Sequence, residues 1–119
     1  MEIETQILVK SAAFVGAGMA MGLGAVGAAI GEGYTAAEAN GAVSRNPELS
    51  GDIFKNMLVG QAVAESASIF ALVVAILMLF LGVPVDNLLN GAALLGAGIC
   101  MGFGAVGSGV GSGFPGGQA

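Results

Sequence analysis

The chain has 119 residues, of which 55% are hydrophobic and only 9% are charged, and it contains no His or Trp. With a mean hydropathy of +0.89, these residues cannot supply the water-facing surface of a soluble domain, which indicates an integral membrane protein. The formal net charge of −5 comes partly from glutamates in apolar segments, so it does not support nucleic-acid binding. The sequence therefore predicts an all-α protein built from transmembrane helices.

The first predicted element is an apolar helix over about residues 7–40, dense in glycine and alanine. It is far longer than the apolar region of a cleaved signal, so we expect a mature membrane helix. In lipid the backbone hydrogen bonds must be made within the segment, so a glycine-rich helix persists and lets neighbours approach closely. The pairs Gly18/Gly22 and Gly27/Gly31 have the spacing of such contacts. This density of small residues predicts a tightly packed layer of helices, as in the inner wall of a ring.

A polar connection follows, over about residues 41–51, and it contains Arg45-Asn46-Pro47-Glu48. Pro47 stops a helix and biases the residue before it away from helical conformation, so we expect a turn between two spans. Arg45 and Lys55 place two of the three basic residues at this end of the spans. By the positive-inside rule, the 41–51 loop is predicted to be cytoplasmic.

The second span, about residues 53–83, carries the stretch Gly60-Gln61-Ala62-Val63-Ala64-Glu65-Ser66. An ionisable group at this depth costs roughly 2.5 kcal/mol or more, so Glu65 needs a partner, a proton or a bound ion. Glu32 and Glu65 each lie about 10 to 15 helical residues from the turn, which places both carboxyls at one level of the membrane. A protonated carboxyl that merely hydrogen-bonds two helices is the alternative to a transport site.

A third predicted span, about residues 88–113, repeats the first with a constant offset of 80 residues, so that 16–27 corresponds to 96–107. In this register Ser112 stands where Glu32 stood, so the second copy lacks the carboxylate. We therefore divide the chain into an ion-binding transmembrane hairpin, 1–83, and a third helix, 84–119. Two possibilities stay open: a protein of three spans, or a fourth span beyond the printed sequence. Cys100 falls inside the third span, where we expect a buried small hydrophobe and not a redox centre.

The hairpin resembles the c subunit, or proteolipid, of rotary ATP synthases. That family has a Gly/Ala-rich first helix, an Arg-Gln-Pro loop, for which this chain has Arg45-Asn46-Pro47, and an essential carboxylate in the second helix. The stretch from Gly60 to Ser66 is similar to the sodium-translocating branch. The repeated third span is similar to longer, vacuolar-type proteolipids, in which one hairpin can lose its carboxylate.

This resemblance implies a Na⁺ site made by Glu32, the Val63 carbonyl, Glu65 and Ser66. Gln61, one turn before Glu65, either orients that carboxylate or packs against a neighbouring helix. Sodium-binding relatives commonly have Thr after the Ser and Tyr five residues after the Glu, where this chain has Ala67 and Phe70. The implied protein has no catalytic residues and no cofactor, and it carries Na⁺ or, alternatively, H⁺.

The resemblance also implies the partners: a homo-oligomeric ring in membrane lipid, the a subunit of the stator, and central-stalk subunits that contact the loop at Arg45, Asn46 and Pro47. The expected location is the cell membrane, crossed several times, in a bacterial inner membrane or its equivalent. Ion flow past the stator would turn the ring and drive ATP synthesis, or ATP hydrolysis would drive ion pumping.

The residues themselves limit the ion chemistry. A desolvated Na⁺ needs several oxygen ligands, whereas a proton needs one carboxylate. Two ionised carboxylates around one Na⁺ would leave a net negative charge in lipid, so we expect Glu32 neutral and Glu65 charged in the sodium-loaded state. Three alternatives are a small multidrug-type proton-coupled exporter, a vacuolar-type proteolipid of an ATP-driven Na⁺ or H⁺ pump, and a helix-packing protein without transport. An exporter of that kind would place a lone Glu among aromatic residues in the first span.

Overall fold

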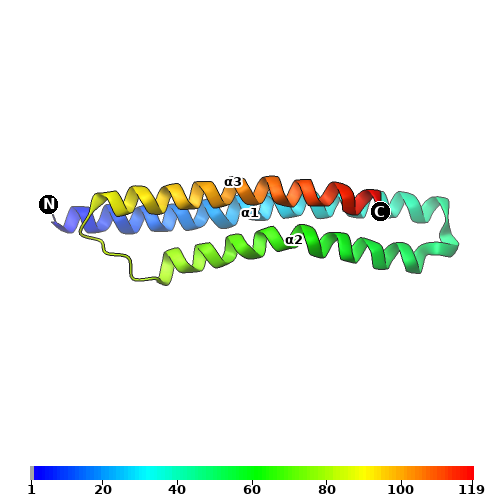
Figure 1. The fold of residues 1–119 in the computed structure, drawn as a ribbon, viewed down its shortest axis with the longest axis horizontal. Coiled ribbons are helices and arrows are strands. Elements are labelled where there is room, and N and C mark those ends of the chain that lie inside the picture. Colours follow the sequence, from blue (N-terminus) through cyan, green and yellow to red (C-terminus); the bar gives the residue numbers. More distant parts are fainter. Residues whose placement is uncertain (1) are drawn as a thin grey trace.

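The computed structural model describes residues 2–119, and all regular structure within that range is helical. Figure 1 shows α1 and α3 side by side along most of their lengths, with α2 running beside them in a rod of 68 × 18 × 14 Å. The elements are α1 (Glu2–Arg45), the 3₁₀ turn η1 (Pro47–Leu49), α2 (Ser50–Phe80) and α3 (Leu88–Gln118). Three of these segments, built around α1, α2 and α3, are long and apolar enough to cross a membrane, which confirms the predicted fold class.

The connection between α1 and α2 is much shorter than the predicted 41–51 loop. Helix α1 continues to Arg45, and Asn46 alone separates it from η1. Asn46 leaves the helical region, with φ −137° and ψ 72°, because the ring of Pro47 disfavours a helical residue before it. Proline is tolerated at the first position of a helix, where its missing N–H has no partner to lose. The predicted break is correct, but the predicted length of the loop is wrong.

The C-terminal ends of α2 and α3 also differ from the predicted ones. Helix α2 ends at Phe80, three residues before the predicted end, and residues 81–87 lead to α3. The side chain of Asn87 caps α3 by accepting a hydrogen bond of 2.9 Å from the Leu89 N–H. Helix α3 runs past the predicted residue 113 to Gln118, with Pro115 in its last turn. A proline so close to a helix end removes only one backbone bond, so the helix continues through it.

Small side chains and bare backbone form the interior of the rod. The buried hydrophobic residues are mostly alanines, and the largest fully buried side chains are Val9 and Thr35. A Cβ placed on Gly27 in α1 would lie 2.5 Å from the Val106 Cα in α3, so glycine is required there. Large hydrophobic side chains instead point outward, as expected where lipid covers the surface. Exposed examples are Phe14, Val26, Phe70, Leu77 and Phe103.

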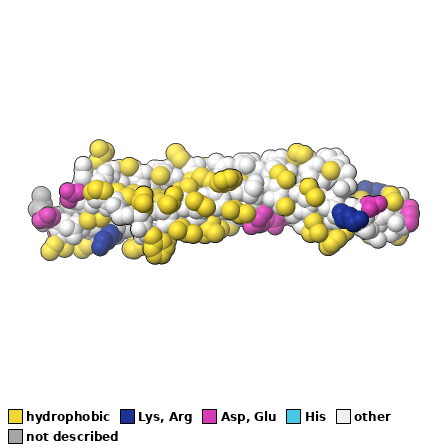
Figure 2. Space-filling model, turned by 60° about the horizontal axis from the view of Figure 1, so that its bottom comes forward, with side chains coloured by type: hydrophobic (Ala, Val, Ile, Leu, Met, Phe, Trp, Pro, Cys, Tyr) yellow, Lys and Arg dark blue, Asp and Glu magenta, His cyan; other side chains and the backbone are white. Residues whose placement is uncertain are grey.

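Charged side chains gather near the ends of the rod. Figure 2 shows basic groups only towards the two ends, hydrophobic groups along the shaft, and a small acidic group near the middle. At the η1 end, Lys55 and Asp52 form an exposed ion pair of 3.7 Å. An acidic group halfway along an apolar shaft is the feature of this surface that packing alone does not explain.

Candidate ion-binding site

The two glutamates of the spanning helices lie at the same level of the rod. Glu32 is thirteen residues before the end of α1 at Arg45, and Glu65 is fifteen residues after the start of α2 at Ser50. At about 1.5 Å per residue, both are about 20 Å from the η1 end. A hydrogen bond of 3.3 Å from Gln61 Nε2 to the Glu32 carbonyl joins the two helices at this level.

The carboxyl groups of Glu32 and Glu65 face each other within hydrogen-bonding reach. Glu32 is half-buried, and its Oε1 is buried with no hydrogen-bond partner among the described residues. Glu65 is exposed on the outside of a single protomer. Two carboxylates can hydrogen-bond only when one of them holds a proton, so this pair is built to share a proton or to share a cation.

Ser68 contributes to this pair, although it was not among the predicted ligands. It is buried, and its hydroxyl donates to the Glu65 carbonyl at 2.8 Å and to Glu65 Oε1 at 3.2 Å. The signal that could have identified Ser68 is its spacing, because residues three apart share one face of a helix. A hydroxyl that donates to a carboxylate oxygen helps to fix the orientation of that carboxylate.

Val63 and Ser66 form a separate pair on an exposed face of α2. The Ser66 hydroxyl donates to the Val63 carbonyl at 2.6 Å, and both residues are exposed. Successive residues of a helix point about 100° apart, so Ser66 does not share the direction of Glu65. Among residues 2–119, no hydrogen bond joins this pair to the two glutamates. The four expected ligands therefore lie as two pairs in one protomer and not as one cage.

Among the described residues, the hydrogen bond of the Gln61 side chain goes to Glu32 and not to Glu65. This side chain reaches the main chain of Glu32, as described above, so it packs α2 against α1. Ala67, in the position where sodium-binding relatives commonly have Thr, is buried in the helix interface, and Phe70 is exposed on the outer surface. Of the two roles considered for Gln61, the structure shows contact with the neighbouring helix.

The family model for the C subunit of ATP synthase matches residues 15–78, which is more than half of the chain. The chain belongs to this ATP synthase C-subunit family. The ATP synthase c subunit of Natranaerobius thermophilus is 47% identical over 78 residues, covering 66% of this chain and 90% of the relative. The c subunit of Dehalococcoides mccartyi is 53% identical over 64 residues, which cover 54% of this chain and 84% of the relative. The c subunit of Petrotoga mobilis is 48% identical over 66 residues, which cover 56% of this chain and 69% of the relative.

The match to the C-subunit family contains both glutamates and the Val63–Ser66 pair, whereas α3 lies outside it. Beside the site, α3 is held by the buried Thr35, whose hydroxyl is 3.0 Å from the Gly31 carbonyl and 3.1 Å from the Gly113 carbonyl. Ser112 donates to the Ser108 carbonyl at 2.7 Å within α3, so its hydroxyl is bonded inside its own helix. In this member of the C-subunit family, α3 thus packs against the site region without adding an acidic group to it.

Two further residues of the spanning helices lie near the ends of this interface or outside it. Tyr34 packs against Phe114 with ring centroids 4.6 Å apart and accepts a hydrogen bond of 2.8 Å from Gln118 Nε2. Cys100 was expected to be buried, but it is exposed. The expectation for Cys100 was wrong for a single protomer because this residue is on the side of α3 that faces away from α1.

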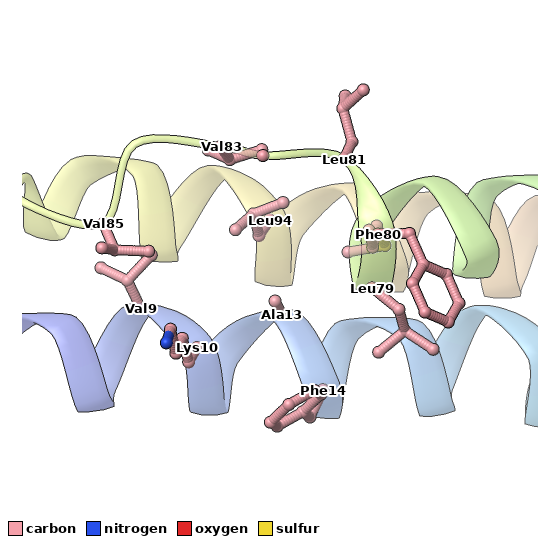
Figure 3. Close-up of a pocket in the computed structure, with 12 residues that line it drawn as sticks. Val9, Lys10, Ala13, Phe14, Leu79, Phe80, Leu81, Val83, Val85 and Leu94 are labelled. Carbon is pink, nitrogen blue, oxygen red and sulfur yellow. The ribbon is translucent and has the colours of Figure 1, made fainter.

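A groove near the N-terminal end of the rod does not involve the glutamates. It has a volume of about 350 Å³ and lies between the start of α1, the end of α2 and the chain that leads to α3. Figure 3 shows Val9, Phe14, Leu79 and Leu94 around it, with Lys10 beside them as the charged residue among those that line it. An apolar groove of this kind at the end of a spanning bundle suits lipid chains, so we place no ion chemistry there.

Proposed function

We propose that this chain is the ion-carrying rotor subunit of a rotary ATP synthase or ATPase, and that it carries Na⁺ on Glu65 within a ring of identical subunits. The observation that carries the proposal is the facing pair of Glu32 and Glu65 at one level of two membrane-spanning helices. Membership of the C-subunit family supports the rotor role. A carboxyl pair placed only for helix packing would not need an exposed member such as Glu65.

The proposed site holds the cation with Glu65 charged and Glu32 protonated, so that the loaded site is neutral overall. Ser68 orients the Glu65 carboxylate through its hydroxyl. The Val63 carbonyl and the Ser66 hydroxyl lie on the exposed face of α2, where they are available to a cation held between this helix and a neighbour in the ring. Na⁺ is a hard cation that prefers such oxygen ligands. A proton shared by the two carboxyls is the alternative cargo.

In this mechanism, the charge of the site decides where it can go. A loaded, neutral site can face lipid, whereas an emptied Glu65 carries a charge that lipid disfavours by roughly 2.5 kcal/mol or more. The empty site is therefore confined to the polar surface of the stator, and rotation carries only loaded sites through lipid. The exposed tip of the hairpin, Arg45-Asn46-Pro47, passes the rotation to the central stalk.

Labelling with a hydrophobic carbodiimide tests this proposal, because the reagent modifies protonated carboxyls within membranes. We expect Glu65 to be the labelled residue, Na⁺ to protect it, and the Glu65→Gln variant to lose both labelling and Na⁺ transport. Glu48→Gln, in the exposed η1 turn, is the control and should behave as the natural chain does. Undiminished Na⁺ transport by Glu65→Gln would refute the proposed role of this residue.

The pH dependence of protection distinguishes the two cargoes. Protons compete with Na⁺ for Glu65, so the Na⁺ concentration needed for half protection should rise by up to about tenfold for each unit of falling pH. A proton carrier should instead show labelling that increases as the pH falls and that Na⁺ does not suppress at any pH. The measurement is the labelled fraction in isolated membranes over a grid of pH and Na⁺ concentration.

A further inference from the structure

The repeated glycines of α1 and α3 do not use the same helix face. In α1, a Cβ at Gly16, Gly24, Gly27 or Gly31 would collide with another helix. Their equivalents 80 residues later, Gly96, Gly104, Gly107 and Gly111, have no neighbouring atom within 4 Å of such a Cβ. The face that α1 uses inside the protomer is therefore unused on α3.

The exchange also holds in the opposite direction. In α3, Gly98, Gly102 and Gly113 are packed against α1, and a Cβ at Gly102 would lie 2.7 Å from the Met19 carbonyl oxygen. Their equivalents in α1, Gly18, Gly22 and Gly33, have nothing within 4 Å. A Cβ at Gly24 would meet Ala71 of α2 at 2.6 Å, so we leave this position out. We call the set 16, 27 and 31 with its α3 equivalents face A, and the set 18, 22 and 33 with its α3 equivalents face B. Inside one protomer, face A of α1 packs on face B of α3.

Non-glycine residues report the same exchange independently. Ala17, Ala20 and Ala28 are at most 4% exposed in α1, whereas their equivalents in α3, Ala97, Cys100 and Ser108, are exposed. Ala105 in α3 is 2% exposed, whereas its α1 equivalent, Ala25, is exposed. These buried positions of α1 are thus exposed in α3, and the reverse holds for Ala105. Ala17 and Ala105 also pack against α2, in clusters with Met78 and Ala71 respectively.

We propose that the exposed face A of α3 binds the exposed face B of α1 in a second copy of this chain, reproducing between protomers the α1–α3 contact made within each protomer. Such a contact is heterologous, since two different surfaces meet, and it leaves the same two surfaces free at the ends of any open chain of protomers. A heterologous contact that closes generates a ring. This inference rests on the ring of the proposed function, and it identifies the two helix faces that would join neighbouring subunits. In such a ring, α1 and α3 alternate around one layer of helices.

The register of this contact follows from the one inside the protomer. There, Gly16 meets Gly98, Gly27 meets Gly109 and Gly31 meets Gly113, a constant difference of 82 residues. Combined with the repeat offset of 80, a residue of α3 should meet the α1 residue of the partner subunit that lies 78 positions earlier. Cys100, which is exposed in the single protomer, therefore lies opposite Gly22 of the partner subunit.

Oxidative cross-linking of the full chain in membranes tests this register, because a disulfide forms only between Cα atoms less than about 7 Å apart. In a Gly22→Cys variant, each protomer has both halves of the link, so we expect a ladder of dimers, trimers and larger products. Val73→Cys is the matched control, since its side chain is exposed on α2 at a similar depth, and it should form no ladder with Cys100.

Mixed samples distinguish this contact from a symmetric one. The natural chain co-expressed with a Gly22→Cys, Cys100→Ala chain should cross-link no further than dimers. If the Gly22→Cys, Cys100→Ala chain alone cross-links, α1 meets α1 and the proposal is overturned. The proposed interface is also overturned if Gly22→Cys gives no ladder of cross-linked products although native gels show an intact ring. That result would leave the proposed function unaffected. Absence of any ring in native gels of the natural chain would instead refute the proposed function along with this inference.

A steric variant provides a second readout that does not depend on oxidation. Gly107 is open in the protomer, so Gly107→Leu should leave each protomer helical, yet the ring should dissociate in mild detergent. Gly82→Leu, open as well but located between α2 and α3, is the control and should keep the ring. An intact Gly107→Leu ring would contradict the proposed interface.

Discussion

The two carboxyls of the site are not equivalent, because Glu32 Oε1 is buried while Glu65 is exposed. A buried oxygen without a partner is costly when charged, so Glu32 is the member of the pair that should keep the proton. In the proposed function, Glu65 is then the member that exchanges its cargo.

Replacing Glu32 with its neutral amide should therefore preserve the loaded site. We expect Glu32→Gln to hold Na⁺ within about threefold of the natural affinity, and Glu32→Ala to lose about tenfold or more, roughly 1.4 kcal/mol, because a buried oxygen ligand is removed. The Na⁺ concentration that protects Glu65 from carbodiimide measures both. A loss in Glu32→Gln as large as that in Glu32→Ala would show that Glu32 binds as a carboxylate.

Removing the Ser68 hydroxyl should weaken the site without abolishing it. A hydrogen bond to a charged group contributes about 1.5 to 3 kcal/mol when fully formed, and the 3.2 Å bond to Glu65 Oε1 is at the long end of the range. We expect Ser68→Ala to raise the Na⁺ concentration for half protection by about fivefold or more. Ser44→Ala, whose hydroxyl bonds the Gly41 carbonyl at the exposed end of α1, should leave it unchanged.

The sequence predicted part of this site and missed part of it. Similar counts from the Pro47 turn predicted the shared level of Glu32 and Glu65, because helical rise is the same in both spans. The separation of Val63 and Ser66 from the glutamates could not be predicted. The identities of the ligand residues do not tell how α2 is rotated about its own axis. Ser68 was missed because the hydroxyl adjacent to Glu65 in the sequence belongs to Ser66.

At the level of helices, glycine decides how closely α1 and α3 approach. Glycine-to-alanine changes in exposed helix interiors usually stabilise by about 1 kcal/mol. Gly27→Ala should do the opposite, because its Cβ would lie 2.5 Å from backbone that cannot move aside. We expect a lower thermal midpoint of the purified protein by circular dichroism. Gly51→Ala, with nothing near its Cβ, is the control and should raise the midpoint or leave it unchanged.

The sequence predicted the type and number of the helices better than their ends. Spans of apolar residues and the break at Pro47 indicated three helices, and all three exist. Helices α1 and α3 extend beyond their predicted ends, because polar residues continue a helix when tertiary contacts support it. At the end of α3, Gln118 and Phe114 contact Tyr34, and these contacts hold the last turn in place beyond residue 113. Such contacts are long-range and cannot be read from local composition.

For the whole molecule, the third helix bears on the number of ions that the proposed ring would carry per turn. Each protomer has one facing glutamate pair, and α3 adds width without a carboxylate. A ring of given circumference should therefore bind fewer ions than a ring of two-helix subunits, which suits ATP-driven pumping better than synthesis. We expect one Na⁺ per protomer when bound ions are counted against protomers in an isolated ring. One ion for every two helices would contradict this prediction.

The short connection between α1 and α2 has a mechanical consequence at the Arg45 end of the molecule. Asn46 alone separates α1 from η1, and α2 begins directly after Leu49 (Figure 1). So short a connection leaves little slack in which a force on the tip could be lost. In the proposed ring, a push on Arg45-Asn46-Pro47 would therefore move α1 and α2 together as one rigid arm.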